Sequence, residues 1–411
     1  MAPRRLIVPL CVTVLAVLLC GCSPGSSAPS RAGKASPAKF PTIPPTTSST
    51  SSTTAPIPSG VATTVPVPPP TVPGWTQAVT TLPPGGGFSS VSCLSDTYCI
   101  ATGGGAGQPG ANQTDGSGVT VSWDGASWSG PSVYLPAPAS GPVTAPLMPA
   151  IDCTSGPLCM IADGSDHVGT GDGTNWSTAA PLPAGPPLAA NPADPGAGHP
   201  GSRSAAVSCP TPTLCVVVDN TGHAYTYRNH GWLATQSFGR PAAAGSPVSS
   251  LFQAGRVGVS CPTADTCVAV VGTSVLDWDG SSWSLEPEPW APTLDATSSA
   301  TAIACSTPTL CAIVSGTGLS YRNGGKAWSP VETIDPHGGL DAISCPTTTM
   351  CMATDSGGSV LTWNGTTWSA PQQVLPQATE YPGTATSLSC PSADFCMVMN
   401  ADGDFATYSG D

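Results

Sequence analysis

Charged and aromatic side chains are scarce in this sequence of 411 residues, at 9% and 6%. Because helix-forming Glu, Lys and Arg are few while 47 Gly and 48 Pro interrupt helices, the composition excludes a predominantly helical enzyme. Acidic residues are absent from residues 1–74, so the rest of the chain carries all 24 acidic side chains against six basic ones. Such an acidic segment lacks the positive surface that phosphate backbones require, which excludes nucleic acid as a partner.

The first apolar run, residues 6–19, follows a basic start and is too short to span a bilayer comfortably. It predicts a cleaved export signal over residues 1–21. The string Leu19-Cys20-Gly21-Cys22 resembles the lipobox of bacterial lipoproteins, although Cys20 stands where that family usually has Ala or Ser. The resemblance implies a lipid anchor on Cys22, with an ordinary secretory signal as the alternative. We therefore expect an extracytoplasmic protein, anchored in the cell membrane and displayed at the cell surface.

Residues 22–73 consist mainly of Ser, Thr, Pro and Ala. A segment with so few large apolar side chains cannot offset the entropy of ordering its backbone, so we predict a disordered linker. Its prolines favour extended polyproline II, which at ~3.1 Å per residue would reach on the order of 150 Å. The linker is therefore predicted to hold the following domain away from the membrane.

Fourteen of the 17 cysteines form seven pairs with five residues between the partners, repeated every 40 to 60 residues. The pairs are Cys93/Cys99, Cys153/Cys159, Cys209/Cys215, Cys261/Cys267, Cys305/Cys311, Cys345/Cys351 and Cys390/Cys396. Zinc ligands usually have two to four intervening residues, and export favours disulfides, so we predict seven disulfides. We predict no metal site and no other cofactor.

One repeat is clearest at residues 342–376. We expect short strands at 343–345, 351–354 and 359–363, and a fourth at 367–374, with Asp-Ser-Gly-Gly and Asn-Gly turns before the third and fourth. Four antiparallel strands in a repeat of this length are typical of a propeller blade.

A Trp is predicted to begin the fourth strand of six repeats, at Trp128, Trp176, Trp232, Trp283, Trp328 and Trp368. The seventh repeat ends without one, and the missing element occurs at the other end of the domain, around Trp75. The sequence therefore predicts an all-β, monomeric, seven-bladed β-propeller over residues 74–411, whose last blade is closed by the N-terminal strand.

The turn between the third and fourth strands recurs as an aromatic residue, Asp or Asn, Gly and a following Trp. Copies lie at 123–128, 171–176, 227–232, 278–283, 321–328 and 363–368. These hairpins resemble degenerate Asp boxes (BNR repeats) of sialidase-like propellers, and the whole repeat resembles those of exported propeller lipoproteins of high-GC bacteria. The resemblance implies structural, non-catalytic roles for Asp124, Asp172, Asp279, Asn323 and Asn364.

Sialidases need three convergent arginines and a Tyr–Glu pair. Two of the five arginines after the linker, Arg228 and Arg322, lie in the turns opposite the expected ligand face, and no motif selects a carboxylate pair. A glycoside hydrolase therefore stays the alternative to our leading hypothesis, a binding scaffold without catalytic residues. A passive wall component is the third possibility.

The insertions in the repeat fall on one face. From Trp to the next Cys there are 25, 33 and 29 residues after Trp128, Trp176 and Trp232, but 17 after Trp328. Long surface loops cost little stability and often carry recognition, so we expect this face to bind a protein or glycan; neutral drift of the insertions is the alternative. The candidate binding residues are Asp163, Asp166, His167, Asp194, His199, Arg203 and Phe252.

Overall fold

The computed structural model describes residues 72–76, 78–80, 87–104, 117–135, 149–155, 158–163, 167–184, 205–220, 222–238, 257–271, 274–286, 300–316, 318–324, 328–378 and 387–410. The predicted signal, Cys22 and the linker up to residue 71 lie outside these residues. Among the described residues, no helix has the length and apolarity needed to cross a bilayer.

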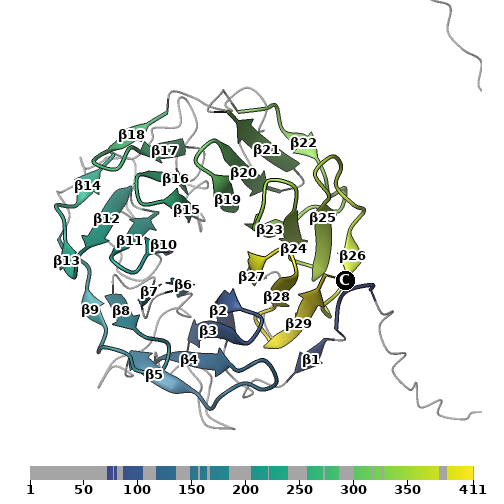
Figure 1. The fold of residues 1–411 in the computed structure, drawn as a ribbon, viewed down its shortest axis with the longest axis horizontal. Coiled ribbons are helices and arrows are strands. Elements are labelled where there is room, and N and C mark those ends of the chain that lie inside the picture. Colours follow the sequence, from purple (N-terminus) through teal and green to yellow (C-terminus); the bar gives the residue numbers. More distant parts are fainter. Residues whose placement is uncertain are drawn as a thin grey trace, which may run out of the picture. The chain divides into compact units, whose positions relative to one another are not determined.

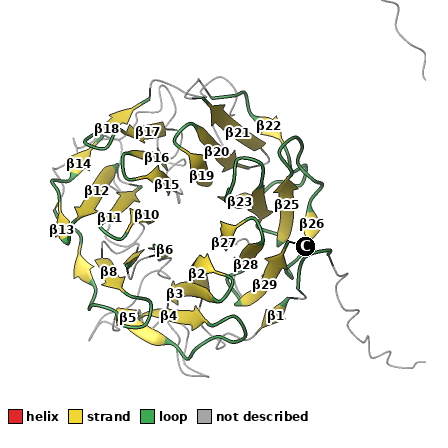
Figure 2. Ribbon diagram, in the orientation of Figure 1, coloured by secondary structure: helices red, strands yellow, loops and turns green. Residues whose placement is uncertain are grey.

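The predicted seven-bladed propeller is confirmed. The described residues form seven antiparallel sheets arranged around a common centre (Figure 1), and Figure 2 shows strands and loops but no helix. From the centre outward, blade 1 consists of β2 (Gly87–Ser95), β3 (Tyr98–Gly104), β4 (Gly118–Trp123) and β5 (Ser132–Leu135). Blade 2 consists of β6 (Ala150–Cys153), β7 (Cys159–Ala162), β8 (His167–Gly171) and β9 (Ala180–Pro181). Blade 3 consists of β10 (Ala205–Thr211), β11 (Leu214–Asp219), β12 (His223–Arg228) and β13 (Gly231–Trp232), with β14 (Gln236–Ser237) also paired to β12.

The other four blades follow the same plan. Blade 4 consists of β15 (Val257–Thr263), β16 (Thr266–Val271), β17 (Ser274–Trp278) and β18 (Trp283–Leu285). Blade 5 consists of β19 (Ala302–Thr307), β20 (Leu310–Ser315), β21 (Gly318–Asn323) and β22 (Glu332–Thr333), and blade 6 of β23 (Leu340–Ser344), β24 (Cys351–Asp355), β25 (Ser359–Trp363) and β26 (Gln372–Gln373). Blade 7 consists of β27 (Ser387–Ser392), β28 (Phe395–Met399), β29 (Asp404–Ser409) and β1 (Val79–Thr80). Strand β1 comes from the N-terminal side and pairs with β29, so the predicted closure of blade 7 is confirmed.

The core lies between the blades. Apolar side chains on both faces of the second strands are fully buried, for example Val216, Val217 and Val218 in blade 3. Each hydrophobic cluster combines residues of two neighbouring blades, as where Val216 of blade 3 packs with Trp283 of blade 4. A blade buries both faces only when it has two neighbours, so the stability of the domain depends on a closed ring.

Side chains also link the innermost strands. The backbone N–H of the first cysteine in a blade donates to the side chain that precedes the equivalent cysteine of the previous blade. These bonds join Cys93 to Ser389 (2.9 Å), Cys153 to Ser92 (3.1 Å), Cys209 to Asp152 (2.7 Å), Cys261 to Ser208 (3.1 Å), Cys305 to Ser260 (2.9 Å) and Cys390 to Ser344 (3.2 Å). Blade 5 has Ala304 at the acceptor position and so offers Cys345 no such oxygen. The bonds satisfy donors on the strand edges that face the centre.

The predicted fourth strand of blade 6, residues 367–374, is too long. Strand β26 covers only Gln372–Gln373, and Trp368 forms an isolated bridge with Trp363 before it. The ladder is interrupted after the Trp because a Ser hydroxyl takes the place of a backbone acceptor and because Pro371 has no N–H to donate.

This interruption recurs around the ring. The serine that follows the Trp accepts a third-strand N–H from Ser122 in blade 1 (2.9 Å), Thr170 in blade 2 (3.0 Å), Tyr321 in blade 5 (3.1 Å) and Thr362 in blade 6 (3.0 Å). The prediction that a Trp begins the fourth strand of six blades is therefore right for Trp283 in β18 and wrong for blades 1, 2, 5 and 6, where the Trp precedes the strand. In blade 3, Trp232 lies in β13 but is its second residue.

Candidate functional site

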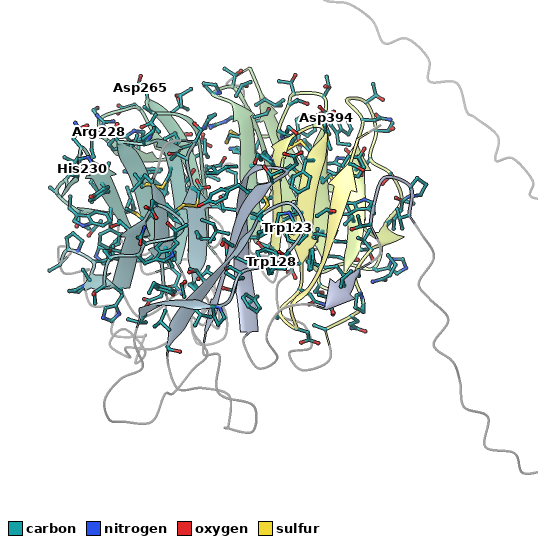
Figure 3. The ribbon with its side chains drawn as sticks, turned by 60° about the horizontal axis from the view of Figure 1, so that its bottom comes forward. Trp123, Trp128, Arg228, His230, Asp265 and Asp394 are labelled. Atoms are coloured by element: carbon teal, nitrogen blue, oxygen red, sulfur yellow. A yellow bond between two sulfur atoms is a disulfide. The ribbon has the colours of Figure 1, made fainter. Side chains whose placement is uncertain are left out.

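The meander of each blade gives the propeller two different ends. The first-to-second and third-to-fourth turns form one end, which we call the disulfide face. The second-to-third turns and the connections to the next blade form the other, which we call the loop face. Figure 3 shows Arg228, at the end of β12, and the turn residues His230, Asp265 and Asp394 of the disulfide face at the upper end of the ring.

The disulfide face has two repeated features, a disulfide in all seven blades and an Asp or Asn turn in four of them. All seven predicted disulfides form, each with Cα atoms 3.9 to 4.1 Å apart. Asp124, Asp172, Asp279 and Asn364 each accept backbone N–H groups two and three residues later, at 2.7 to 3.0 Å. These contacts agree with the structural role expected for the four residues. The fifth, Asn323, is not among the residues whose side chains the structure describes.

The second cysteines of the pairs form the predicted disulfides and are also core residues. No more than 1% of the residue is exposed in five blades, at Cys99, Cys215, Cys267, Cys311 and Cys396. Each of these five begins or nearly begins a second strand and belongs to a hydrophobic cluster shared with the preceding blade. Packing between blades therefore shields these sulfurs from any ligand, so the disulfides stabilise the fold and do not form a binding surface.

The same hydrogen bonds that form the Asp-Gly turns lower the pKa of the three aspartates. For Asp124 and Asp172 the main cause is the backbone N–H of Ser127 and Asn175. The hydroxyl of Ser281 and nearby N–H groups lower the pKa of Asp279 to about 2. These carboxylates are committed to their own turns as anions and are poorly suited to acid–base catalysis near neutral pH.

The loop face has a different repeated feature. In four blades the residue four positions after the second cysteine accepts a backbone N–H four residues further on. These bonds join Asp163 to His167 (2.8 Å), Asp219 to His223 (3.0 Å), Asp355 to Ser359 (2.7 Å) and Asn400 to Asp404 (3.0 Å). The donor is a backbone N–H in every case, and Ser359 and Asp404 provide it as well as the two histidines do. Turn formation therefore explains the Asp or Asn acceptor, but it does not explain why the donor residue is His in blades 2 and 3.

In blades 2 and 3 the imidazole also faces the buried carboxylate. His167 Nδ1 lies 3.8 Å from Asp163 Oδ2, and His223 Nδ1 lies 3.5 Å from Asp219 Oδ2. The His167 side chain is 38% exposed and that of His223 11%. Because Nδ1 faces the buried carboxylate, Nε2 is the ring nitrogen left to donate to a ligand or accept from one.

A tyrosine accompanies both Asp–His pairs. Tyr225 donates its hydroxyl to Asp219 Oδ2 at 3.0 Å. In blade 2 the position of Tyr225 is occupied by Gly169, and Tyr134 of blade 1 fills the space, since a Cβ on Gly169 would lie 3.2 Å from its ring. Burial, and then the charge of Asp163, raise the pKa of Tyr134. Two adjacent blades thus each have an Asp–His–Tyr set, but they differ: Tyr225 donates to Asp219, whereas the buried hydroxyl of Tyr134 has no hydrogen-bond partner among the described residues.

A third pair lies in the connection between blades 5 and 6. The His337 N–H donates to Asp335 Oδ1 at 2.9 Å, and His337 Nδ1 lies 3.5 Å from the same oxygen. The Asp335 side chain is fully buried, whereas that of His337 is 80% exposed. Each histidine that the structure describes on the loop face therefore sits beside a buried aspartate.

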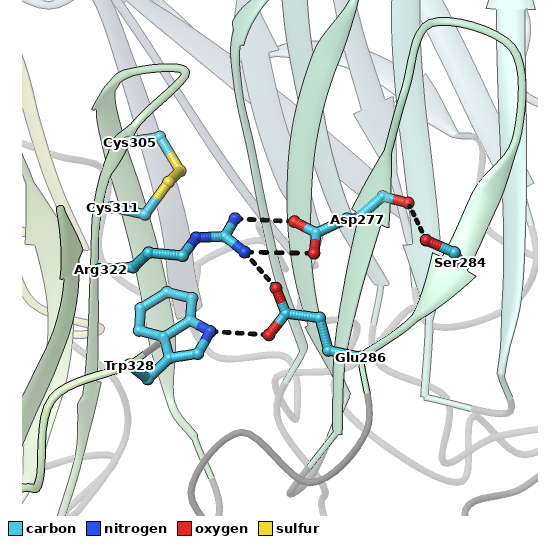
Figure 4. Close-up of polar contacts among 7 residues, drawn as sticks. All are labelled: Asp277, Ser284, Glu286, Cys305, Cys311, Arg322 and Trp328. Atoms are coloured by element: carbon cyan, nitrogen blue, oxygen red, sulfur yellow. Dashed lines mark hydrogen bonds and ion pairs between the residues drawn. A yellow bond between two sulfur atoms is a disulfide. The ribbon is translucent and has the colours of Figure 1, made fainter. Parts of the chain in front are cut away.

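At the seam between blades 4 and 5, Arg322 of β21 joins two carboxylates of blade 4 (Figure 4). It donates to Asp277 at 2.7 and 3.2 Å and also pairs with Glu286, the residue after β18. Trp328 Nε1 donates to the other oxygen of Glu286 at 3.0 Å, and the guanidinium lies 5.1 Å from the Trp328 ring centroid. These contacts connect the outer parts of two blades.

The two carboxylates of this seam have opposite pKa shifts. Burial, together with hydrogen bonding to Asp277, raises the pKa of Glu286 to about 7. Burial is the largest single effect on Asp277, but the hydrogen bonds with Arg322 and Glu286 and the charge of Arg322 together outweigh it and lower the pKa of Asp277. Paired carboxylates with separated pKa values occur in glycosidases. Here, however, both already bind Arg322, so the geometry is that of an ionic link between blades.

Of the predicted binding residues, the structure places Asp163 and His167 together on the loop face, as described above. Asp166, Asp194, His199, Arg203 and Phe252 lie outside the described residues. Asp219, His223 and Tyr225 were not among the predicted binding residues. Their signal was present, because Asp and His occur four and eight residues after the second cysteine in both blade 2 and blade 3. Within the described part of the chain, no group of three or more His, Cys, Asp or Glu side chains is arranged to hold a metal ion.

No protein-family model and no curated protein matches the chain. Solved structures do match. They include YCF48 bound to D1 peptide, with a TM-score of 0.51, 15% identity, and coverage of 84% of this chain and 98% of that one. A catalytically inactive virginiamycin B lyase from Staphylococcus aureus with quinupristin has a TM-score of 0.55, 7% identity, and coverage of 82% and 100%. The WD40 propeller domain of Doa1 has a TM-score of 0.51, 13% identity, and coverage of 83% and 98%. What these proteins share with this chain is the propeller fold.

Proposed function

We propose that this protein is an exported, lipid-anchored binding propeller that recognises a protein partner through its loop face. The observation that carries the proposal is that the longest connections and the unusual histidine-containing turns occur in the same blades of the loop face. The longest blade-to-blade connections follow Trp128, Trp176 and Trp232, and these connections adjoin blades 2 and 3, whose turns hold the two Asp–His–Tyr sets. Features that vary from blade to blade at one end of a repeated scaffold are better explained by a role in recognition than by a role in stability.

The charges of the described residues favour a partner with a basic surface. Both described arginines, Arg228 and Arg322, lie at the ends of β12 and β21 nearest the disulfide face. The described turns of the loop face have Asp and His instead. By sequence, Arg203, Arg240 and Arg256 belong to the connections of this face, so the preference for a basic partner rests on the strongly acidic balance of the chain after residue 74. Complementary charge increases association rates and selects partners, so a segment rich in Lys or Arg fits this face best.

Proteins of the same fold support the class of ligand. One structure is described as bound to a peptide, another as containing quinupristin, and a third as the mitotic checkpoint complex. Since the sequence identities are 15% or less, they support the use of propellers as binding scaffolds and identify no residue of this chain.

The proposed anchor and linker fit this role. A diacylglyceryl group on Cys22 would keep the protein at the membrane, and residues 22–73 would let the loop face reach a partner away from the bilayer. Glycoside hydrolysis has less support, because the carboxylates of Asp277 and Glu286 are both bound by Arg322.

A displayed random-peptide library selected against the mature protein tests the proposal. We expect the enriched peptides to be basic, and we expect the double variant His167→Gln/His223→Gln to weaken their binding at least tenfold, which corresponds to about 1.4 kcal/mol. His230→Gln is the matched control, because His230 lies on the disulfide face. Equal losses in both variants, or peptides that bind only the disulfide face, would contradict the proposed site. Binding on a glycan array without peptide binding would contradict the class of partner.

A further inference from the structure

Asn364 occupies the position at which three equivalent turns have an aspartate. Asp124, Asp172 and Asp279 are each followed by a glycine with φ near +90°, and Asn364 is followed by Gly365 with φ of 92°. Since the turn forms equally well with an amide and with a carboxylate, its hydrogen bonds do not require Asn. What distinguishes Asn364 is its chemistry, because an amide carbonyl carbon is an electrophile and a carboxylate is not.

Three donors converge on the side-chain oxygen of Asn364. Thr366 donates both its backbone N–H (3.0 Å) and its hydroxyl (2.8 Å), and Thr367 donates its N–H at 2.9 Å. Both backbone donors identify the acceptor as Oδ1, since the amide nitrogen could not accept them. Donors held around an oxygen in this way stabilise the negative charge that forms on it when its carbon is attacked.

The attacking group is adjacent in the chain. Gly365 has no side chain to shield its backbone nitrogen, and among the described residues no hydrogen bond engages its N–H. Asn364 itself is exposed, so water and hydroxide reach the turn. A nucleophile, an electrophile and an oxyanion-stabilising set of donors are therefore brought together by four consecutive residues.

We propose that Asn364 is a site of spontaneous deamidation, in which its own turn promotes the reaction. Hydroxide removes the proton of the Gly365 N–H, and the nitrogen attacks Asn364 Cγ to form an N–Cγ bond and an oxyanion on Oδ1. Water returns a proton to Nδ2, the oxyanion re-forms the carbonyl, the Cγ–Nδ2 bond breaks and ammonia leaves, which gives a five-membered succinimide and regenerates hydroxide. Water opens this ring to aspartate or isoaspartate, so the net change is Asn plus water to Asp or isoAsp plus ammonia.

The aspartate product has a defined structural consequence. It gives blade 6 the carboxylate that blades 1, 2 and 4 already have, with charge-assisted hydrogen bonds from the same donors. It also adds a negative charge to the disulfide face, so the inference is independent of the proposed recognition by the loop face. The Asp-Gly turns should not follow the same route, because their lowered pKa values keep the carboxylates ionised and unreactive.

Peptide mapping by mass spectrometry in H₂¹⁸O tests the proposal. The folded protein and the same chain, denatured and reduced, are incubated in mildly alkaline buffer. We expect ¹⁸O to enter at position 364 several-fold faster in the folded protein, with no isomerisation at Asp124, Asp172 or Asp279. A rate at Asn364 that is equal or slower in the folded protein overturns the proposal.

Two variants separate the role of the donors from that of the sequence Asn-Gly. Thr366→Val removes the hydroxyl donor and should slow deamidation of the folded protein roughly three- to tenfold, without effect on the denatured chain. Equal rates in the folded wild type and variant overturn the oxyanion argument. Asn364→Asp, which represents the product, should have a melting temperature at least equal to that of the wild type. A lower melting temperature would show that the turn does not accept the product.

Discussion

Trp75 and Tyr408 form a β-bridge with ring centroids 5.5 Å apart, although they stand near opposite ends of the propeller sequence. The Thr76 N–H continues the pairing by donating to the Thr407 carbonyl at 2.8 Å. This contact gives blade 7 its outer strand and so joins the last blade to the start of the domain.

Trp75→Ala should therefore destabilise the whole domain. Trp75 is buried, and truncation of a large buried aromatic side chain costs about 3–5 kcal/mol. Val79→Ala in the same segment is the control, because Val79 is 46% exposed and should change stability by less than about 0.5 kcal/mol. Urea unfolding with the disulfides intact measures both. Similar small losses in the two variants would mean that closure contributes little.

The hydrogen bonds between inner strands predict two opposite substitutions. Ser208→Ala removes the acceptor of the Cys261 N–H and should cost about 1 kcal/mol. Ala304→Ser introduces the hydroxyl that blade 5 lacks and should leave stability unchanged or raise it by up to about 1 kcal/mol. Thermal unfolding of both proteins, and of the double variant, checks the pair. A large loss in Ala304→Ser would show that this seam has no room for the bond.

Glu286 predicts a pH-dependent stability. Its pKa of about 7 in the folded protein exceeds its ordinary value of 4.5, so the folded state binds more protons than the unfolded state between these values. The contribution of this group is fully present below pH 4.5 and is lost as the pH rises through about 7. Glu286→Gln should remove this fall, which amounts to a few kcal/mol at most, whereas Glu332→Gln in the exposed fourth strand of blade 5 should leave it. Parallel pH profiles of wild type and Glu286→Gln would contradict the assignment.

Asp152 predicts a similar change over a lower pH range. It replaces the serine of the inner ring, and burial raises its pKa to about 6, despite hydrogen bonds from Cys209, Ser92 and Cys153. By the same linkage, its contribution is present below about pH 4 and is lost as the pH rises through 6. Asp152→Ser should therefore stabilise the protein more at pH 7 than at pH 4, as measured by the shift in melting temperature. An effect that does not depend on pH would contradict the raised pKa.

The sequence predicted the parts of the fold that depend on local spacing. Short repeated patterns predicted the disulfide pairs and the positions of second and third strands such as Ser359–Trp363. They also predicted that the N-terminal segment around Trp75 supplies the outer strand of blade 7. The fourth strands were predicted too long because a serine hydroxyl and a proline interrupt a ladder whose side-chain pattern continues.

The candidate site was less predictable because most of it depends on neighbouring blades. Arg322 meets Asp277 and Glu286 across 45 and 36 residues of sequence, and nothing in the spacing indicates that contact. Tyr134 of blade 1 packs into blade 2 because Gly169 has no side chain, which is visible only once the blades are packed. The Asp–His spacing of His223, by contrast, was readable as an exception to the repeat.

The most direct test of the account is to find which end of the propeller contacts a partner in the producing cells. A photo-crosslinking amino acid at position 337, on the exposed loop face, is compared with one at position 230 on the disulfide face. The account predicts a crosslink to a discrete protein from position 337 and none from position 230. Crosslinks from position 230 alone would show that the disulfide face is the recognition surface and that the account is wrong.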